Sequence, residues 1–173
     1  MAQEEVTLKD GTRAVIRPIR RDGIDKLLEG ISKLSDRSRR MRFFSNRVDY
    51  SAEEVRHLVE TDGINTVTFV LAVLGEDDRE IESVAAAHSI RLNFQSDTAE
   101  VAVAVLDNWQ KKGVGSALMK RLAAHARESG VRKWMAYIAS ENQAMRHLLL
   151  RFGELLNEEP MNGSVEILIE LFE

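Results

Sequence analysis

Cysteine is absent from this chain of 173 residues, which excludes disulfides, thiolate metal sites and a cysteine nucleophile. Proline occurs only twice, and no repeat, linker or low-complexity segment divides the chain. No apolar run approaches the roughly 20 residues that a membrane-spanning helix needs. The N-terminal residues Met1–Glu5 lack the basic-then-apolar order of a signal peptide. We therefore expect a cytoplasmic protein that makes no membrane contact.

Hydrophobic residues make up 44 % of the chain and charged residues 30 %. This balance is typical of a soluble globular protein rather than a disordered one. The length suits one hydrophobic core, so we expect a single domain over residues 1–173.

The formal net charge of −4 argues against a general nucleic-acid binder, which needs a positive surface for phosphate contacts. The charge is nevertheless uneven: residues 1–47 carry twelve Lys and Arg against seven Asp and Glu, or +5, which leaves −9 for the remainder. The densest basic stretch contains Arg37, Arg39, Arg40 and Arg42 and runs into Phe43 and Phe44. One interpretation is a solvated helix end whose aromatic side chains enter the core. The alternatives are a rim that attracts an acidic substrate or phosphates and, third, an RNA-binding patch.

Hydrophobic periodicity in the first half of the chain predicts two strands, two helices and a hairpin. The strands are Val6–Leu8 and Arg13–Ile19, the helices Asp22–Leu34 and Ser51–Glu60, and the hairpin Thr66–Leu74 with Ile81–Leu92. An Asp-Gly pair marks the first turn, and Ser51 with Glu54 has the pattern of a capping box.

The second half predicts a strand–helix–strand–helix–strand order. Its elements are Ala99–Leu106, Val114–Ser129, Val131–Ile138, Glu141–Phe152 and Ser164–Phe172. The first strand is almost wholly apolar, as expected for a strand covered on both faces. The whole pattern predicts an α/β (α+β) fold with a mixed, mostly antiparallel central sheet and helices on both faces. The crossover through the long helix should place its two flanking strands parallel.

A turn that contains lysines and glycines, residues 107–116, joins the apolar strand to the long helix. Gly113 and Gly115 let the backbone approach a ligand without a Cβ in the way. Because they open a helix, free N–H groups and the positive end of the helix dipole point at one spot, and Lys111 and Lys112 add charge. This combination predicts a pyrophosphate cradle built from backbone, although a short Gly-x-Gly also occurs in tight strand–helix connections.

Common nucleotide and metal motifs are absent from the sequence. The Gly-x-x-x-x-Gly-Lys-Ser/Thr spacing of a Walker loop is missing, as are the third glycine and the later acidic residue of the dinucleotide fingerprint. His57, His88, His125 and His147 fit no metal-ligand spacing such as His-Glu-x-x-His, so we expect no metal.

The motif Gln110-x-x-Gly113-x-Gly115 resembles the Gln/Arg-x-x-Gly-x-Gly/Ala acyl-CoA motif of the GNAT superfamily of N-acetyltransferases. Arg13–Phe44 resembles the N-terminal strand and helices of its bacterial protein-lysine acetyltransferase branch, and residues 99–105 resemble the fourth GNAT strand. Asn142-x-x-Met145-x-x-Leu148 resembles the family's Asn-x-x-Ala-x-x-Leu helix. The resemblance implies a GNAT fold that uses acetyl-CoA as cosubstrate and acetylates an amine.

The resemblance also implies which residues contact acetyl-CoA. Backbone groups of Val103, Ala104 and Val105 would pair with pantetheine as with an added strand, and an N–H of this segment, from Ala104, would polarise the thioester carbonyl. Asn142 resembles an asparagine whose amide meets the cofactor, and it also suits the N-cap of the last helix. The pyrophosphate would lie against Gln110, Lys111, Lys112, Gly113, Val114, Gly115 and Ser116.

Acetyl transfer needs a neutral amine, and a lysine amine with a pKa of about 10.4 is mostly protonated near neutral pH, so a base is required. Glu100 is the only ionisable residue in its apolar strand, and several GNAT acetyltransferases resemble this chain in having a glutamate there. By the two-residue period Glu100 shares a face with Ala102 and Ala104, which leaves room for a substrate arm; a β-bulge, usual in the family, would break this alternation. We expect Glu100 to be the general base; the alternative is an exposed strand start without chemistry.

The sequence departs from the family pattern after the asparagine. Many GNAT enzymes carry a tyrosine seven residues later, as general acid for the thiolate, but Leu149 stands there and neither Tyr50 nor Tyr137 occupies that place in the motif. Either the thiolate leaves unassisted, or Ser140 or water donates the proton. Glu154 stands where the family often has phenylalanine, which affects the wall of the acceptor pocket.

Three functions fit these observations. The first is acetylation of a protein lysine, which the N-terminal resemblance favours, and the second is acetylation of a small amine such as a polyamine, amino acid or antibiotic. The third is a non-catalytic acyl-CoA-binding sensor, which Leu149 keeps open and Glu100 opposes. We expect acetyl-CoA and an acceptor amine as partners of a monomer or homodimer, with no specific nucleic acid and no membrane.

Overall fold

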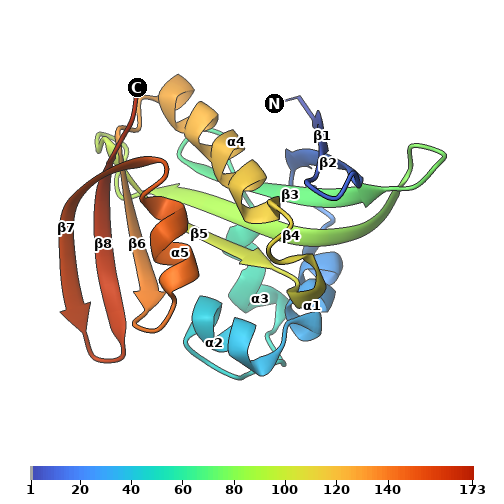
Figure 1. Ribbon diagram of the computed structural model, residues 1–173, viewed down its shortest axis with the longest axis horizontal. Helices are drawn as coiled ribbons and strands as arrows, with labels where there is room; N and C mark the ends of the chain where they lie inside the picture. The colour runs from blue at the N-terminus through green and yellow to red at the C-terminus, as the bar shows by residue number, and fades with distance from the viewer. Residues whose placement is uncertain (1) are drawn as a thin grey trace.

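The computed structural model describes residues 2–173, which form one sheet flanked by helices (Figure 1). The sheet has eight strands in the order β1-β2-β3-β4-β5-β6-β8-β7. Neighbouring strands are antiparallel except for the parallel pair of β5 and β6. The predicted α/β (α+β) class, with its mixed and mostly antiparallel sheet, is confirmed.

Most predicted elements form, with their ends displaced by a few residues. The strands are β1 (Glu4–Thr7), β2 (Arg13–Pro18), β3 (Thr66–Leu74), β4 (Glu80–Arg91), β5 (Thr98–Val105), β6 (Lys133–Ala139), β7 (Gly153–Met161) and β8 (Ser164–Leu171). The helices are α1 (Ile24–Lys33), α2 (Asp36–Phe43), α3 (Ala52–Val55), α4 (Val114–Ser129) and α5 (Gln143–Leu149), with 3₁₀ turns η1 (Arg56–Leu58) and η2 (Asp107–Trp109). Helix α4 has the bounds that its periodicity predicts.

Two predicted helices are shorter in the structure. The capping box between Ser51 and Glu54 forms, but the helix it opens continues beyond Val55 only as a 3₁₀ turn. The last helix is shorter because Asn142 caps its first turn and the chain leaves helical geometry after Leu149.

Strand β7 is absent from the sequence-based prediction. It lies at the edge of the sheet and pairs only with β8. Pro160 lies within it, and the register shifts between Leu155 and Asn157. Because an edge strand with proline and a shifted register need not alternate polar and apolar residues, its sequence carries no periodic signal.

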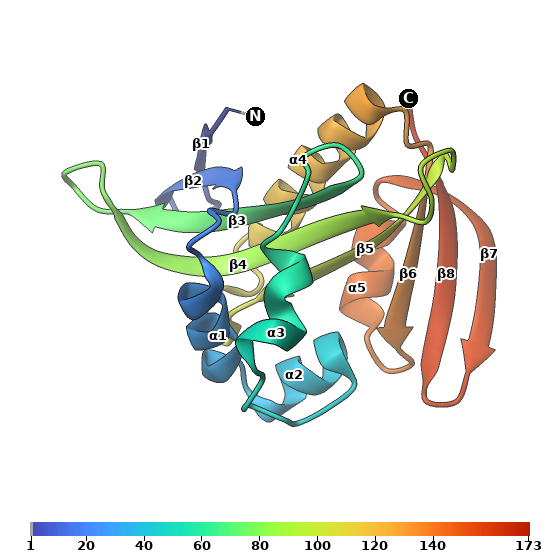
Figure 2. The same ribbon diagram turned by 180° about the vertical axis from the view of Figure 1, so that it is seen from behind.

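Helices cover both faces of the sheet, as predicted (Figures 1 and 2). Helices α4 and α5 lie on one face, and α1, α2 and α3 lie on the other (Figure 2). The core beneath α4 contains Phe69, Leu118, Leu122, Trp134 and Ile169, all of them almost inaccessible to solvent. Among residues 2–173, no helix is both long enough and apolar enough to cross a membrane.

Candidate active site

Strands β5 and β6 separate at Glu100, and we call the gap between them the split. The two strands pair only at their beginnings, Thr98 with Lys133, Ala99 with Trp134 and Glu100 with Met135. On its other side β5 pairs with β4 as far as Val105 without a register shift. Beyond Glu100, β5 therefore has one free backbone edge, which faces β6 across the split (Figure 1).

The β4–β5 register shows which backbone groups lie along this free edge. Leu106 donates its N–H to the carbonyl of Val84 at 2.9 Å, and successive residues of a strand point these groups in opposite directions. Val103 and Val105 therefore face the split, whereas Ala104 faces β4. The prediction that Ala104 supplies the N–H for the thioester carbonyl does not agree with this register; the N–H of Val103 faces the split instead.

Glu100 lies at the apex of the split, where the last β5–β6 pair ends. Its side chain is half-buried, while its neighbours Ala99 and Val101 point beneath α4 and are 1 % and 2 % exposed. Because the β4–β5 register has no bulge, Glu100 shares a face with Ala102 and Ala104, as predicted. The alternative of an exposed strand start does not agree with this position.

Two polar groups that the sequence analysis did not connect with Glu100 lie within its electrostatic reach. Burial lowers the pKa of Arg42 on α2 to about 10, against an opposing effect of the Glu100 charge. Glu166 raises the pKa of Tyr137 on β6 above its usual value, and Glu100 adds to this effect. The register of β6 places Tyr137 two residues beyond Met135, on the wall of the split opposite β5. Alternation along β6 is the sequence signal that could have identified Tyr137.

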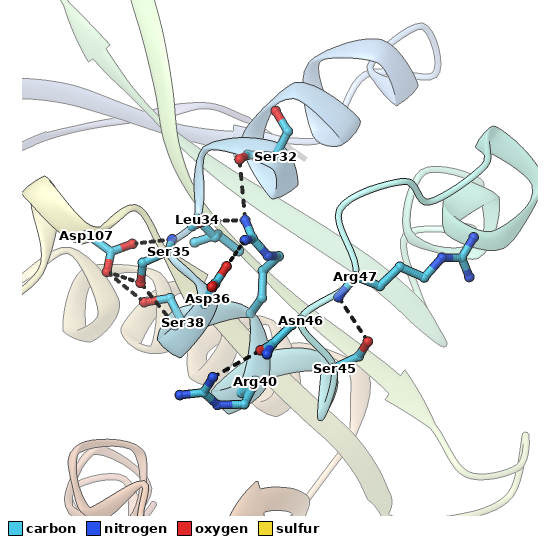
Figure 3. Close-up of polar contacts among 11 residues, drawn as sticks. Ser32, Leu34, Ser35, Asp36, Ser38, Arg40, Ser45, Asn46, Arg47 and Asp107 are labelled. Atoms are coloured by element: carbon cyan, nitrogen blue, oxygen red, sulfur yellow. Dashed lines mark hydrogen bonds and ion pairs between the residues drawn. The ribbon is translucent and has the colours of Figure 1, made fainter.

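The turn after β5 is attached to α2 through Asp107 (Figure 3). Its carboxylate accepts hydrogen bonds from the backbone N–H of Ser35 at 3.0 Å, from the Ser35 hydroxyl at 2.6 Å and from the Ser38 hydroxyl at 3.0 Å. Although burial raises the pKa of Asp107, these hydrogen bonds lower it below its usual value. The turn is therefore fixed against the N-terminus of α2.

Gln110 and Lys112, two side chains of the turn that are predicted to contact the ligand, bind other residues of the protein. The side-chain amide of Gln110 donates to the Val105 carbonyl and to the Ser38 hydroxyl, each at 3.1 Å. Lys112 forms an ion pair with Asp10 at 3.0 Å. Hydrogen bonds, first from Thr12 and then from Lys112, lower the pKa of Asp10 to about 2. These side chains shape the turn and leave its backbone to face a ligand.

The backbone at the start of α4 forms an open cradle. Gly113 precedes the helix in the left-handed conformation, with φ of +88°, which glycine adopts without strain. The first-turn N–H groups of Val114, Gly115 and Ser116 have no partner within the helix. The Ser116 hydroxyl accepts a hydrogen bond from Arg151 at 2.9 Å. Free amides, the helix dipole and a nearby guanidinium together suit an anion such as a pyrophosphate.

The structure shows the roles of Asn142 at the start of α5 and of Leu149 at its end. The Asn142 side-chain oxygen accepts a hydrogen bond from the Met145 N–H at 3.1 Å, so the predicted N-cap role is confirmed. Leu149, at the position of the family tyrosine, is 0 % exposed and belongs to the core. The side chain at this position therefore supplies no proton to a leaving group.

The basic stretch on α2 is not the solvated helix end that one interpretation predicts. Arg37 and Arg40 are exposed, but Arg39 is buried and Arg42 is half-buried, because positions three apart share a helix face. Only Phe43 packs against the core, while Phe44 is 50 % exposed. The inner face of α2 thus brings charge toward the sheet.

The histidines give no sign of metal binding in the part of the chain that the structure describes. Residues 2–173 contain no group of three or more His, Asp or Glu side chains placed to hold a metal ion. Burial lowers the pKa of His88 to about 3 and also lowers that of His125. Both side chains are therefore neutral near pH 7.

Known acetyltransferases are similar to this chain in sequence. The acetyltransferase PA5475 of Pseudomonas aeruginosa is 27 % identical over 154 residues, which cover 89 % of this chain and 81 % of that protein. The acetyltransferase Pat of Mycolicibacterium smegmatis is 28 % identical over 158 residues, but the match covers only 45 % of that longer protein.

Similarity in structure extends over nearly the whole chain. The crystal structure of the GNAT domain of S. lividans PAT matches with a TM-score of 0.83 and 28 % identity, over 98 % of this chain and 97 % of that one. Residues 35–153, which contain the split, the turn and Glu100, match the Acetyltransferase (GNAT) family. The chain therefore belongs to the GNAT family and is an N-acetyltransferase.

Proposed function

We propose that this N-acetyltransferase uses acetyl-CoA to acetylate the side-chain amine of a protein lysine, with Glu100 as the general base. The observation that carries the proposal is the position of Glu100 at the apex of the split, on the strand that leads directly to the Gly113 cradle. A single strand thus connects a base to an anion site. The likeness to the S. lividans PAT domain over 98 % of the chain supports a protein acceptor.

Acetyl-CoA fits the split and the cradle in one continuous path. The N–H groups of Val114, Gly115 and Ser116 are available to its pyrophosphate, and Lys111 adds a positive charge. The free edge can pair with pantetheine as it would with a strand, through the backbone groups of Val103 and the N–H of Val105, whose carbonyl already accepts from Gln110. When bound, acetyl-CoA supplies an activated acetyl thioester.

Residues on either side of the split supply the proton transfers. The Glu100 carboxylate accepts a proton from the acceptor amine, directly or through one water molecule. Tyr137, on the opposite wall, carries the hydroxyl that we assign to protonate the departing thiolate in place of the buried Leu149. The N–H of Val103 faces the split and is the donor that we assign to the thioester carbonyl.

The sheet beyond the split offers an open approach for a polypeptide. In Figure 2 no described helix lies in front of β8 and β7. The register places Tyr137, Glu166 and Glu159 in one row and Lys133, Glu170 and Glu154 in another on this face. The only ammonium of the two rows already pairs with Asp97 at 3.2 Å. The excess of carboxylates favours the approach of a cationic chain segment that carries the target lysine.

The test compares protein and free amines as acceptors. The enzyme is incubated with acetyl-CoA and either lysine-containing peptides and whole-cell protein or a panel of polyamines and amino acids, and CoA thiol release is measured. We expect release with peptides, together with acetyl-lysine detected by mass spectrometry, and much less release with Glu100→Gln. Release with free amines alone would replace the protein acceptor by a small molecule. Binding of acetyl-CoA without release to any acceptor would contradict the proposed reaction.

A further inference from the structure

A cavity of about 130 Å³ lies between α1 and the sheet. It shares no residue with the cradle at the start of α4 that we assign to acetyl-CoA. Its walls come from α1, α2 and the inner face of β3, β4 and β5, and it reaches β5 at Ala104 and Leu106. Small residues, among them Gly30, Ala86 and Ala104, leave the space open. Because most of the wall is apolar, its few polar groups decide what it can bind.

One end of the cavity carries a buried hydroxyl without a partner. Thr68 is 2 % exposed and lines the cavity, and its Oγ1 has no hydrogen-bond partner among residues 2–173. In the β3–β4 register Thr68 lies opposite His88, which is 7 % exposed. A buried hydroxyl without a partner is unfavourable, so this end of the cavity is suited to a polar ligand group.

The same end holds the guanidinium of Arg42 without a contacting countercharge. Its Nη2 lies 3.1 Å from Nδ1 of His88, and no carboxylate of the described residues forms an ion pair with it. Burial, together with the charge of Arg42, lowers the pKa of His88 to about 3, so its neutral ring offers no compensating charge. Glu100 acts on Arg42 only beyond ion-pair distance. A half-buried guanidinium that has no ion-pair partner among the described residues favours an anionic ligand.

The remaining charges around the cavity do not supply that anion. Glu80 is engaged by Arg17 at 2.6 and 2.7 Å and by Arg20 at 3.1 Å. Glu80 lies outside the wall, whose charged residues are Arg17, Arg20, Asp22, Lys26 and Arg42. Among the described residues, four cations and one carboxylate therefore line the cavity, and Arg17 and Arg20 are the two cations that pair with Glu80.

We propose that this cavity binds a small organic carboxylate, whose oxygens accept hydrogen bonds from Arg42 and Thr68 and whose apolar body lies on the alanine-rich wall. A cavity of about 150 Å³ accommodates benzene, so about 130 Å³ suits a ligand of about five or six non-hydrogen atoms. The cavity contains none of the residues that we assign to the pyrophosphate, and it lies on the face of β5 that Ala104 shares with Glu100.

The test uses butyrate as the probe and butyramide, which has the same shape but no charge, as its control. Isothermal titration calorimetry on the full chain should detect butyrate binding and at least about tenfold weaker butyramide binding. Arg42→Gln should abolish the preference for butyrate. Arg37→Gln, an exposed arginine on the same helix, should keep wild-type affinity.

Thr68→Val tests the cavity even if the Arg42→Gln protein does not fold. It preserves side-chain shape and removes the unpaired hydroxyl, so the free protein should melt no lower than wild type while butyrate affinity falls about three- to tenfold. Equal binding of butyrate and butyramide, unchanged affinity in Thr68→Val, or an equal loss in Arg37→Gln would each overturn the proposal. No acetyl transfer is measured, so these outcomes are independent of the proposed enzymatic reaction.

Discussion

The free edge of β5 and the face of β5 that lies beneath α1 and α2 are organised in different ways. Along the edge, the atoms that we assign to pantetheine are backbone groups of Val103 and Val105, and almost any side chain would preserve them. On the face, Glu100 and its surroundings depend on particular side chains from α2 and β4. Cofactor binding should therefore respond to changes in backbone conformation, whereas turnover should respond to changes in side-chain chemistry.

The largest difference between the effect on turnover and the effect on acetyl-CoA binding should come from Glu100→Gln. Loss of a general base typically lowers turnover by about 10²- to 10⁴-fold, while the free edge and the cradle remain intact. We expect kcat to fall by that order and the acetyl-CoA dissociation constant to stay within twofold, about 0.4 kcal/mol, by steady-state kinetics and calorimetry. Glu4→Gln, the same change at an exposed position of strand β1, should keep kcat near wild type. Unchanged kcat in Glu100→Gln would remove it from the mechanism.

The second-largest effect, a loss of acetyl-CoA affinity, should come from Gly113→Ala. A Cβ in the left-handed conformation costs about 1–2 kcal/mol, so the turn should relax away from the cradle geometry and acetyl-CoA should bind about tenfold more weakly. Gly130→Ala is the matched control, since Gly130 has φ of +77° at the other end of α4 and open space around it. It should lower stability without changing affinity. Equal affinities in the two variants would argue against an anion site at Gly113.

A smaller effect should follow from Asp107→Asn, which weakens the link between the turn and α2. We expect unfolding free energy at pH 7 to fall by about 1 kcal/mol, because the carboxylate is only partly shielded from water. The folded-state pKa of Asp107 is lowered, so its contribution is complete above the unfolded pKa of about 3.9 and is lost as pH falls through the folded value. Urea unfolding of the wild-type protein and of Asp107→Asn should therefore show a gap in unfolding free energy at pH 7 that closes in acid. A gap of constant size would show that the hydrogen bonds to Asp107 are not responsible.

The smallest effect concerns charge near the cradle. Lys111→Gln should weaken acetyl-CoA binding about twofold at low ionic strength, and the difference should vanish in high salt, because exposed charges are screened. The double variant Asp10→Asn/Lys112→Gln removes an ion pair without changing net charge and should bind as wild type does. If the double variant binds much more weakly than Lys111→Gln, the Asp10–Lys112 pair rather than free charge supports the cradle.

Local signals explain what could be predicted from the sequence. The glycines at 113 and 130 and the apolar stripe between them define α4, and the turn is recognisable because its chemistry lies within a few consecutive residues. The groups within electrostatic reach of Glu100 are different: Arg42 and Tyr137 come near it through tertiary packing and strand register. The unpaired hydroxyl of Thr68 depends on what surrounds it in three dimensions. Strand β7 carries no periodicity because its edge position imposes none.

The attachment of Asp107 to Ser35 and Ser38 joins the two parts of the enzyme that we assign to its two substrates. The carboxylate belongs to the turn that leads into the cradle, while the serines belong to the start of the helix that holds Arg42 near Glu100. A displacement of the turn would act on that helix through these hydrogen bonds. By reciprocity, whatever acetyl-CoA does to the affinity for an acceptor, the acceptor does equally to the affinity for acetyl-CoA. Such a coupling would change the two affinities equally, whichever substrate binds first.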